Sequence, residues 1–251
     1  MRISTLCLIT AVFVVPLISF ASSNSRVDYV KQQLVSSGFD VSTVNALFGN
    51  KKIVVYPYRA ISYKQPNWVV VKKKLFNQTL IQAGLAYIAS NQSIFNKAEK
   101  DFGVPRGVIV GIIAIETDFG KNSGDYVTFN TLYSRMKQWP AMQWKSQANE
   151  LIGLSKYCLG SHIDCFSIKG SYAGAFGLVQ FMPSSLLAYG VDGNQDGVID
   201  LSQPADAIPS AANFIKNHGW EQNQLLALTH YYGSSVGYPQ IVLTYASLLG
   251  N

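Results

Sequence analysis

The stretch Gly107-Val-Ile-Val-Gly-Ile-Ile-Ala-Ile115, followed directly by Glu116, decides how this chain is interpreted. Pro105 stands just before it, where a helix can begin because the first turn does not need the amide hydrogen that proline lacks. We therefore expect an apolar helix that carries one carboxylate at its end. A carboxylate withdrawn from water holds its proton to higher pH, because desolvation disfavours the charged form. Glu116 is accordingly the candidate general acid. The alternative is an amphipathic helix whose last turn places Glu116 in solvent.

A second informative segment covers residues 170–185, Gly-Ser-Tyr-Ala-Gly-Ala-Phe-Gly-Leu-Val-Gln-Phe-Met-Pro-Ser-Ser. It combines small residues with an aromatic, amide and thioether cluster just before a proline. Glycines let the backbone approach a ligand closely, and Gln180 offers both a donor and an acceptor to a group such as a sugar acetamide. The segment therefore suits close contact with a partner or a ligand.

An aspartate-rich loop follows. Oxygen ligands stand at relative positions 1, 3, 5, 7 and 9, the seventh through a backbone carbonyl: Asp192, Asn194, Asp196, Val198 and Asp200. With Gly197 at position 6, this is the pattern of an EF-hand calcium loop. Gln203 replaces the acidic residue at position 12, so we expect at most a weak structural calcium site, with an affinity of about 10⁻⁴–10⁻³ M or weaker. The alternative is a metal-free turn.

These three features together resemble the membrane-bound lytic murein transglycosylase B family, and the similarity runs from about residue 26 to the C-terminus. Members of that family cleave the glycan strands of bacterial peptidoglycan. The resemblance implies a lysozyme-like fold and a lone acid without a catalytic cofactor. Glu116 would protonate the oxygen between N-acetylmuramic acid and N-acetylglucosamine. It would then act as base on the muramyl C6 hydroxyl, whose attack on C1 closes a 1,6-anhydro ring.

The resemblance also implies residues that contact the sugars: Ser171, Gln180, Phe181, Met182, Phe214, Tyr231 and Tyr232. Two of them depart from the family pattern. Tyr232 stands where an asparagine is expected, and Phe214 stands where a tyrosine is usual, which removes a hydroxyl. These departures affect positioning and turnover more than the class of reaction. For Phe181, Met182 and Phe214 the alternative is core packing.

Two other functions remain open. A lysozyme-type hydrolase needs a second carboxylate, and Asp125 could serve only if its loop folds back, whereas Asp118 is two residues from the acid and points to another helix face. A catalytically silent wall-binding scaffold is the other. The G-x-S-x-G pattern at residues 233–237 predicts no serine hydrolase, because no acidic residue or histidine follows Ser235.

The N-terminus predicts export. Arg2 supplies a positive charge, Leu6 to Phe20 are mostly apolar, and small residues favour cleavage after Ala21. The apolar stretch is shorter than the roughly 20 residues of a membrane span. We expect a periplasmic monomer without a transmembrane segment. Loss of Arg2 lowers the net charge from +6 to +5, which favours anionic partners such as peptidoglycan. The exported location argues against nucleic acid.

Two cysteines remain in the mature chain, Cys158 and Cys165. In an oxidising periplasm they can form a disulfide, which for so short a ring contributes roughly 2–3 kcal/mol at most. Two free thiols are the alternative. The basic run at residues 72–74 predicts a solvated helix face.

Helical periodicity dominates the rest of the chain, so we expect a mostly α fold. The expected helices cover residues 26–37, 41–49, 68–76, 80–89, 93–102, 105–116, 129–136, 144–154, 184–189, 204–217, 222–231 and 236–249. The expected organisation is a signal peptide at 1–21, an N-terminal helical subregion at 22–98 and a lysozyme-like catalytic core at 99–251. That core includes the EF-hand-like loop, residues 192–203.

Overall fold

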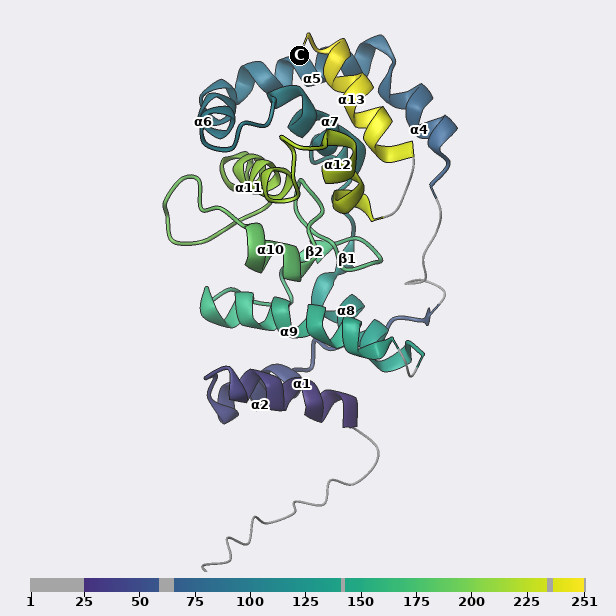
Figure 1. The fold of residues 1–251 in the computed structure, drawn as a ribbon. Coiled ribbons are helices and arrows are strands. Elements are labelled where there is room, and N and C mark those ends of the chain that lie inside the picture. Colours follow the sequence, from purple (N-terminus) through teal and green to yellow (C-terminus); the bar gives the residue numbers. More distant parts are fainter. Residues whose placement is uncertain (1–24, 59–65, 141–142, 234–236, 251) are drawn as a thin grey trace, which may run out of the picture.

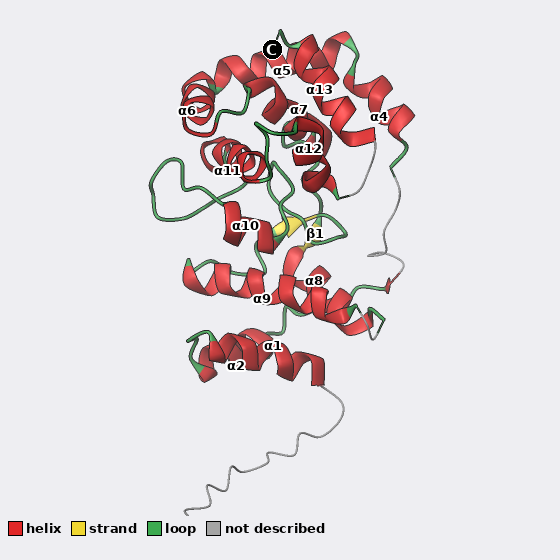
Figure 2. Ribbon diagram, in the orientation of Figure 1, coloured by secondary structure: helices red, strands yellow, loops and turns green. Residues whose placement is uncertain are grey.

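The computed structural model describes residues 25–58, 66–140, 143–233 and 237–250. The expected signal peptide and Ser235 lie outside these residues. Helices dominate the described chain, as the sequence predicts (Figures 1 and 2). Among the described helices, none is both long and apolar enough to cross a membrane.

The helix bounds follow the expected pattern closely. In chain order the helices are α1 (Ser25–Ser36), α2 (Val41–Phe48), α4 (Trp68–Leu75), α5 (Gln78–Ser90), α6 (Gln92–Phe102), α7 (Arg106–Thr117), α8 (Thr128–Gln138), α9 (Trp144–Gly160), α10 (Pro183–Tyr189), α11 (Pro204–Asn217), α12 (Gln224–Tyr232) and α13 (Gly237–Leu248). The largest deviation is α9, which continues to Gly160 instead of ending at Leu154.

The helices are arranged in tiers (Figure 1). At one end α1 packs against both α2 and α9, and α9 pairs with α8 to form the middle tier. The other end is a larger lobe, in which α4, α5, α6, α11, α12 and α13 surround α7. Among the described helices of the expected N-terminal subregion, α1 and α2 lie at one end of the molecule, and α4, α5 and α6 lie at the other (Figure 1). A continuous hydrophobic core connects the tiers.

The apolar helix α7 lies inside the larger lobe. Every residue from Gly107 to Ala114 is buried. Gly111 allows α13 to approach closely, since a side chain there would meet Val242 at 3.3 Å. The helix ends at Asp118, whose φ of 51° is left-handed. This packing fixes the last turn, and with it the position of Glu116.

Two short strands, which the sequence did not predict, join the end of α7 to residues 170–185, called the glycine-rich segment from here on. Strand β1 (Tyr126–Val127) pairs antiparallel with β2 (Lys169–Gly170). Gly124 sits so close to β2 that a side chain would come within 2.1 Å of the Gly170 oxygen. From there, Thr117 Oγ1 donates to the Leu178 carbonyl at 2.9 Å. The glycine-rich segment is thus held against the end of α7.

Candidate active site

Glu116 occupies the last turn of α7 and is partly buried. Tyr238, from the start of α13, donates its hydroxyl to Glu116 Oε1 at 2.9 Å. Burial raises the pKa of Glu116 to about 7, although the hydrogen bond from Tyr238 acts in the opposite direction by favouring the carboxylate. A large fraction of the carboxyl groups is therefore protonated near neutral pH. This side chain is able to give up a proton and to take one back.

An aromatic cluster surrounds the acid. The Tyr238 ring is fully buried and stacks on Tyr232 at 4.7 Å between centroids. Trp68 from α4 meets Tyr232 edge-on at 5.1 Å. Burial, and next the charge of Glu116, raise the pKa of Tyr231 and of Tyr238 well above 10. Both hydroxyls stay neutral hydrogen-bond donors at physiological pH.

A second aromatic layer supports this cluster from behind. Tyr231 donates its hydroxyl to the Val179 carbonyl at 2.7 Å, and its ring packs on Phe181 and Phe214 at 5.9 and 5.0 Å. Phe181 is only 3% exposed and Phe214 only 6%. Both rings therefore take part in core packing, and their contact with a sugar stays a prediction.

Three other predicted contact residues lie on the glycine-rich segment or just after it. Gln180 has a left-handed backbone, with φ of 49°, and its amide nitrogen donates to the carbonyls of Ser123 and Gly177. The Ser171 hydroxyl accepts backbone hydrogen bonds within its own loop. Met182 is partly buried at the start of α10. Gln180 thus ties two loops together, and its contact with a sugar stays a prediction.

The other nearby carboxylates have different surroundings. Asp118 forms ion pairs with Lys74 at 3.1 Å and with Lys121 at 3.6 Å. Lys74 belongs to the basic run, so one of those lysines contributes to the end of α7. Asp125 is exposed in the loop before β1. Glu116 is the carboxylate whose buried setting suits a general acid.

The aspartate-rich loop is held by its own backbone. Asp192 accepts from the amides of Asp196 and Gly197, at 3.2 and 2.8 Å, and Gln203 is exposed. Asp206, in the first turn of α11, is fully buried and accepts from the amides of Gly193 and Asp200. Within the described ranges, no group of three acidic, histidine or cysteine side chains is arranged to hold a metal ion.

Cys158 and Cys165 lie together in the core. Both are buried free thiols in the structure, so the expected disulfide is not formed there. Contact with Cys165, together with burial, raises the pKa of the Cys158 thiol. The pairing predicted for an oxidising compartment stays a prediction, and the close approach of the two thiols is compatible with it.

The sequence did not point to Tyr238 and Trp68, which lie near the acid, or to Asp206, which supports the aspartate-rich loop. Tyr238 is 122 positions from its partner in the sequence, and Trp68 belongs to a helix that looked unrelated to the site. Neither is part of a recognisable motif. Asp206 carried a usable signal, because it is an acidic residue just past the loop at the start of a predicted helix.

Comparison with known proteins places this geometry in a family. Residues 22–235 match the model of the transglycosylase SLT domain. Over 221 residues the chain is 29% identical to membrane-bound lytic murein transglycosylase B of Escherichia coli (strain K12). The match covers 83% of this chain and 61% of that protein, so the chain spans about three fifths of the relative's length.

Solved structures share the fold. The Escherichia coli lytic transglycosylase Slt35 in complex with calcium aligns with a TM-score of 0.80 at 23% identity, over 90% of this chain and 92% of that one. SltB3 from Pseudomonas aeruginosa in complex with NAG-anhNAM-pentapeptide aligns with a TM-score of 0.76 at 18% identity, over 92% and 80%. The lysozyme-like expectation agrees with these matches. Because the family model covers most of its length, this chain belongs to the transglycosylase SLT domain family.

Proposed function

We propose that this protein is a lytic transglycosylase that cleaves the β-1,4 bond between N-acetylmuramic acid and N-acetylglucosamine in peptidoglycan. The observation that carries the proposal is the position of Glu116 at the end of the buried helix α7, where Tyr238 donates to it and burial raises its pKa to about 7, in a chain of the transglycosylase SLT domain family. Its relatives include a murein transglycosylase and a SltB3 structure with a bound anhydromuramyl fragment.

Glu116 acts twice in the proposed mechanism. First its proton passes to the bridging oxygen while the bond from that oxygen to the muramyl C1 breaks. The hydroxyl of Tyr238 then stabilises the new carboxylate through the hydrogen bond seen at 2.9 Å. Next the carboxylate takes the proton of the muramyl C6 hydroxyl as that oxygen bonds to C1. The product is a 1,6-anhydro ring, and Glu116 returns to its protonated form.

This mechanism suits a site with one buried carboxylate. Hydrolysis with inversion or with a covalent intermediate needs a second one. Asp118 is engaged by lysines and Asp125 is exposed. The substrate supplies the nucleophile instead.

The proposed sugar contacts include five partly buried side chains: Ser171, Gln180, Met182, Tyr231 and Tyr232. Phe181 and Phe214 hold Tyr231 from behind. Tyr232 occupies the place where the family pattern has asparagine, and its ring stacks on Tyr238 instead. We propose that this stacking keeps the Tyr238 hydroxyl directed at Glu116.

The proposed location is the periplasm, reached through the N-terminal signal, with peptidoglycan as the partner. A second part of the proposal is that the loop at residues 192–203 binds calcium weakly. Its oxygen donors suit a hard divalent cation, and Slt35 was solved with calcium. Calcium would have to replace backbone amides as partners of Asp192 and Asp196. The ion would stabilise the loop and take no part in the reaction.

Mass spectrometry of sugars released from purified peptidoglycan tests the function. Products with anhydromuramyl ends are expected. Reducing muramyl ends would identify a lysozyme-type hydrolase, in which Asp125 assists. No release beyond that of the Glu116→Gln variant would identify a catalytically silent wall-binding protein.

A further inference from the structure

Helix α4 is a short element of the larger lobe, and it packs against both helices that carry the acid and its hydrogen-bond donor, α7 and α13. Figure 1 shows it beside α13. Asn67 caps its N-terminus by accepting from the amides of Val69 and Val70, so the helix begins at Trp68. Leu75 is its one buried residue, whereas Val69 and Val70 are 79% and 60% exposed. Helix α4 therefore contributes little to the core.

Trp68, at the first position of α4, lies against the start of α13. A side chain at Gly237 would meet the Trp68 ring at 3.1 Å, so the indole ring rests directly on that backbone. The same ring meets Tyr238 edge-on, with centroids 6.1 Å apart, and meets Tyr232 edge-on at 5.1 Å. Edge-on contacts between aromatic rings are favourable and directional. Trp68 therefore restricts where the Tyr238 ring can lie.

Lys74, in the last turn of α4, lies at the end of α7. Its ammonium nitrogen is 3.1 Å from Asp118 Oδ2. Asp118 is the C-cap of α7, two residues after Glu116, and its φ of 51° is left-handed. The Asp118 side chain is only 15% exposed, whereas the Lys74 side chain is 58% exposed. Lys74 therefore does more than cover a solvated helix face, because it holds the residue that ends α7.

These two contacts lie at opposite ends of one helix. Trp68 and Lys74 are six residues apart, which is about 9 Å along an α-helix. One end of α4 thus lies on the segment that carries Tyr238, and the other end lies on the segment that carries Glu116. The hydrogen bond from Tyr238 to Glu116, at 2.9 Å, requires that these two segments keep their spacing.

We propose that α4 is a rigid spacer between α13 and α7, and that Trp68 and Lys74 are positioning residues for the acid. Trp68 acts through Tyr238, and Lys74 acts through Asp118. Together they keep the Tyr238 donor in place while Glu116 gives up its proton and takes one back. A displacement of about 1 Å near the reacting atoms can lower a rate about 100-fold. The inference rests on the proposed function and deepens it, because it names residues that set the geometry of the acid.

Two variants disturb the two ends of α4 and leave the acid and its donor unchanged. Trp68→Leu keeps an apolar side chain but removes the aromatic ring, and Trp68→Phe restores a ring at the same position. Lys74→Met removes the ion pair with Asp118. Circular dichroism confirms folding, and the assay is the rate of anhydromuropeptide release from purified peptidoglycan.

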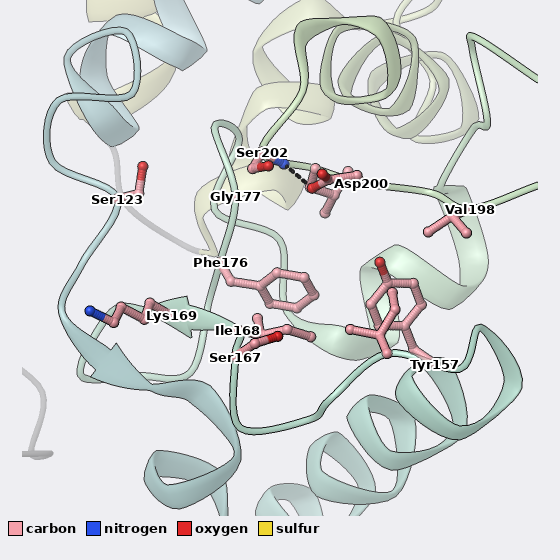
Figure 3. A pocket seen from close by; sticks show the side chains of 12 residues that line it. Ser123, Tyr157, Ser167, Ile168, Lys169, Phe176, Gly177, Val198, Asp200 and Ser202 are labelled. Carbon is pink, nitrogen blue, oxygen red and sulfur yellow. Dashed lines mark hydrogen bonds between the residues drawn. The ribbon is translucent and has the colours of Figure 1, made fainter. Parts of the chain in front are cut away.

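Matched controls make the same changes elsewhere. Trp144→Leu replaces a tryptophan of α9 that is also partly buried and meets Tyr29 edge-on at 5.3 Å, and Lys73→Met replaces an exposed lysine of α4. The cavity of about 590 Å³ in Figure 3 is lined by other parts of the chain, including Tyr157 of α9 and Phe176 of the glycine-rich segment. No described residue of its lining belongs to α4, α7 or α13. The two test variants therefore leave that lining as it is.

We expect kcat to fall about tenfold for Trp68→Leu, less than a displacement of a full 1 Å would cause. For Lys74→Met we expect a fall of about two- to threefold, because exposed ion pairs are weak. KM should stay at the wild-type value in both variants. Trp68→Phe should recover most of the lost kcat, and both controls should match the wild type. Wild-type kcat in either variant would overturn the role of that residue, and so would a loss that appears in KM instead.

A double-mutant cycle shows whether Trp68 acts through Tyr238. In the Tyr238→Phe background the hydroxyl that Trp68 positions is absent. Adding Trp68→Leu to that background should therefore lower kcat by less than about twofold, since the two residues act as one unit. A further loss of about tenfold would mean that the two residues act independently, as distant sites do. That result would overturn the proposal.

A measurement without substrate separates this inference from the proposed function. In protein labelled at tyrosine Cζ, the carbon resonance of Tyr238 is assigned with Tyr238→Phe. It should move when Glu116→Gln changes its hydrogen-bond partner, and it should move less than about half as far when Trp68→Leu is also present, because hydrogen bonds weaken steeply with poor geometry.

The outcomes of the two kinds of experiment are distinguishable. If the Tyr238 resonance behaves as expected in a protein that releases no anhydromuropeptides, the reaction is wrong and the role of Trp68 stands. If the protein releases them but the resonance moves equally far with and without Trp68→Leu, the reaction stands and the role of Trp68 is wrong.

Discussion

Two groups of carboxylates show how differently this molecule treats the same chemical group. Glu116 is withdrawn from water, and its carboxylate accepts a hydrogen bond from the Tyr238 hydroxyl. In the aspartate-rich loop, Asp192 accepts hydrogen bonds from the backbone amides of Asp196 and Gly197. Asp206, in α11 beside the loop, accepts from those of Gly193 and Asp200. Amide donors stabilise the charged form, whereas an apolar enclosure favours the neutral form. A carboxylate that exchanges its proton is therefore distinguished by what surrounds it.

The largest expected effect follows from removing the proton of the acid. Glu116→Gln keeps the shape but cannot transfer a proton, so we expect product release to fall by about 10²–10⁴-fold or more. Glu221→Gln, at an exposed position, is the matched control and should leave the rate unchanged. The measurement is the rate of anhydromuropeptide formation, with circular dichroism to confirm folding. A Gln variant with a tenth or more of the wild-type rate would contradict the role of Glu116.

The second expected effect is on the way the free energy of unfolding changes with pH. The pKa of Glu116 rises from 4.5 when exposed to about 7 in the fold, so the folded state binds more protons than the unfolded chain between these pH values. The stabilisation is complete below pH 4.5 and is lost as pH rises through 7. It amounts to about 3 kcal/mol. Urea unfolding measures the free energy of unfolding of the wild type and of Glu116→Gln at several pH values. The difference between the two proteins should change by this amount between pH 4.5 and pH 7. If the free energies of unfolding of the two proteins change with pH in parallel, the pKa of Glu116 is not raised by burial.

The third prediction concerns Asp206, a buried carboxylate that backbone amides stabilise. Replacing it with asparagine presents an NH₂ group to one of two backbone amides, because the carboxylate oxygens accept from Gly193 and Asp200. We expect a loss of about 1.5–3 kcal/mol in the free energy of unfolding. Asp125→Asn, at an exposed site, should stay within about 0.5 kcal/mol. Thermal denaturation of the two variants measures the contrast, and equal midpoints would refute the role of Asp206.

The smallest expected effect is a shift in the pKa of Glu116 when its hydrogen-bond donor is removed. Tyr238→Phe removes the hydrogen bond that favours the Glu116 carboxylate, so the pKa of Glu116 should rise and the pH profile of kcat should move to higher pH, by up to about one unit. Tyr231→Phe is the matched control, because that hydroxyl bonds to the Val179 carbonyl instead. The pH profile of kcat for Tyr231→Phe should stay at the wild-type position, even if kcat itself is lower. A shift with Tyr231→Phe alone would reverse the assignment of these two tyrosines.

The sequence predicted best those features that depend on residues close together in the chain. The apolar run before Glu116 predicted α7, because a helix with no polar face must be buried. The remaining features depend on tertiary packing. The strands β1 and β2 are two residues long, too short for any periodicity. The sequence alone did not show that the Phe214 ring is nearly buried, at 6% exposure, because that depends on the helices packed around it. Tyr238 acquires its role only when α13 packs beside α7.

The central claim is that the Glu116 carboxyl group is protonated near neutral pH, and its most direct test is a titration of that group. Carbon NMR of protein labelled at glutamate side chains, with Glu116→Gln used to assign the resonance, gives the pKa without any substrate. We expect the resonance of Glu116 to titrate with a pKa near 7. A value near 4.5 would contradict it, because an acid that is ionised at neutral pH cannot protonate the leaving oxygen.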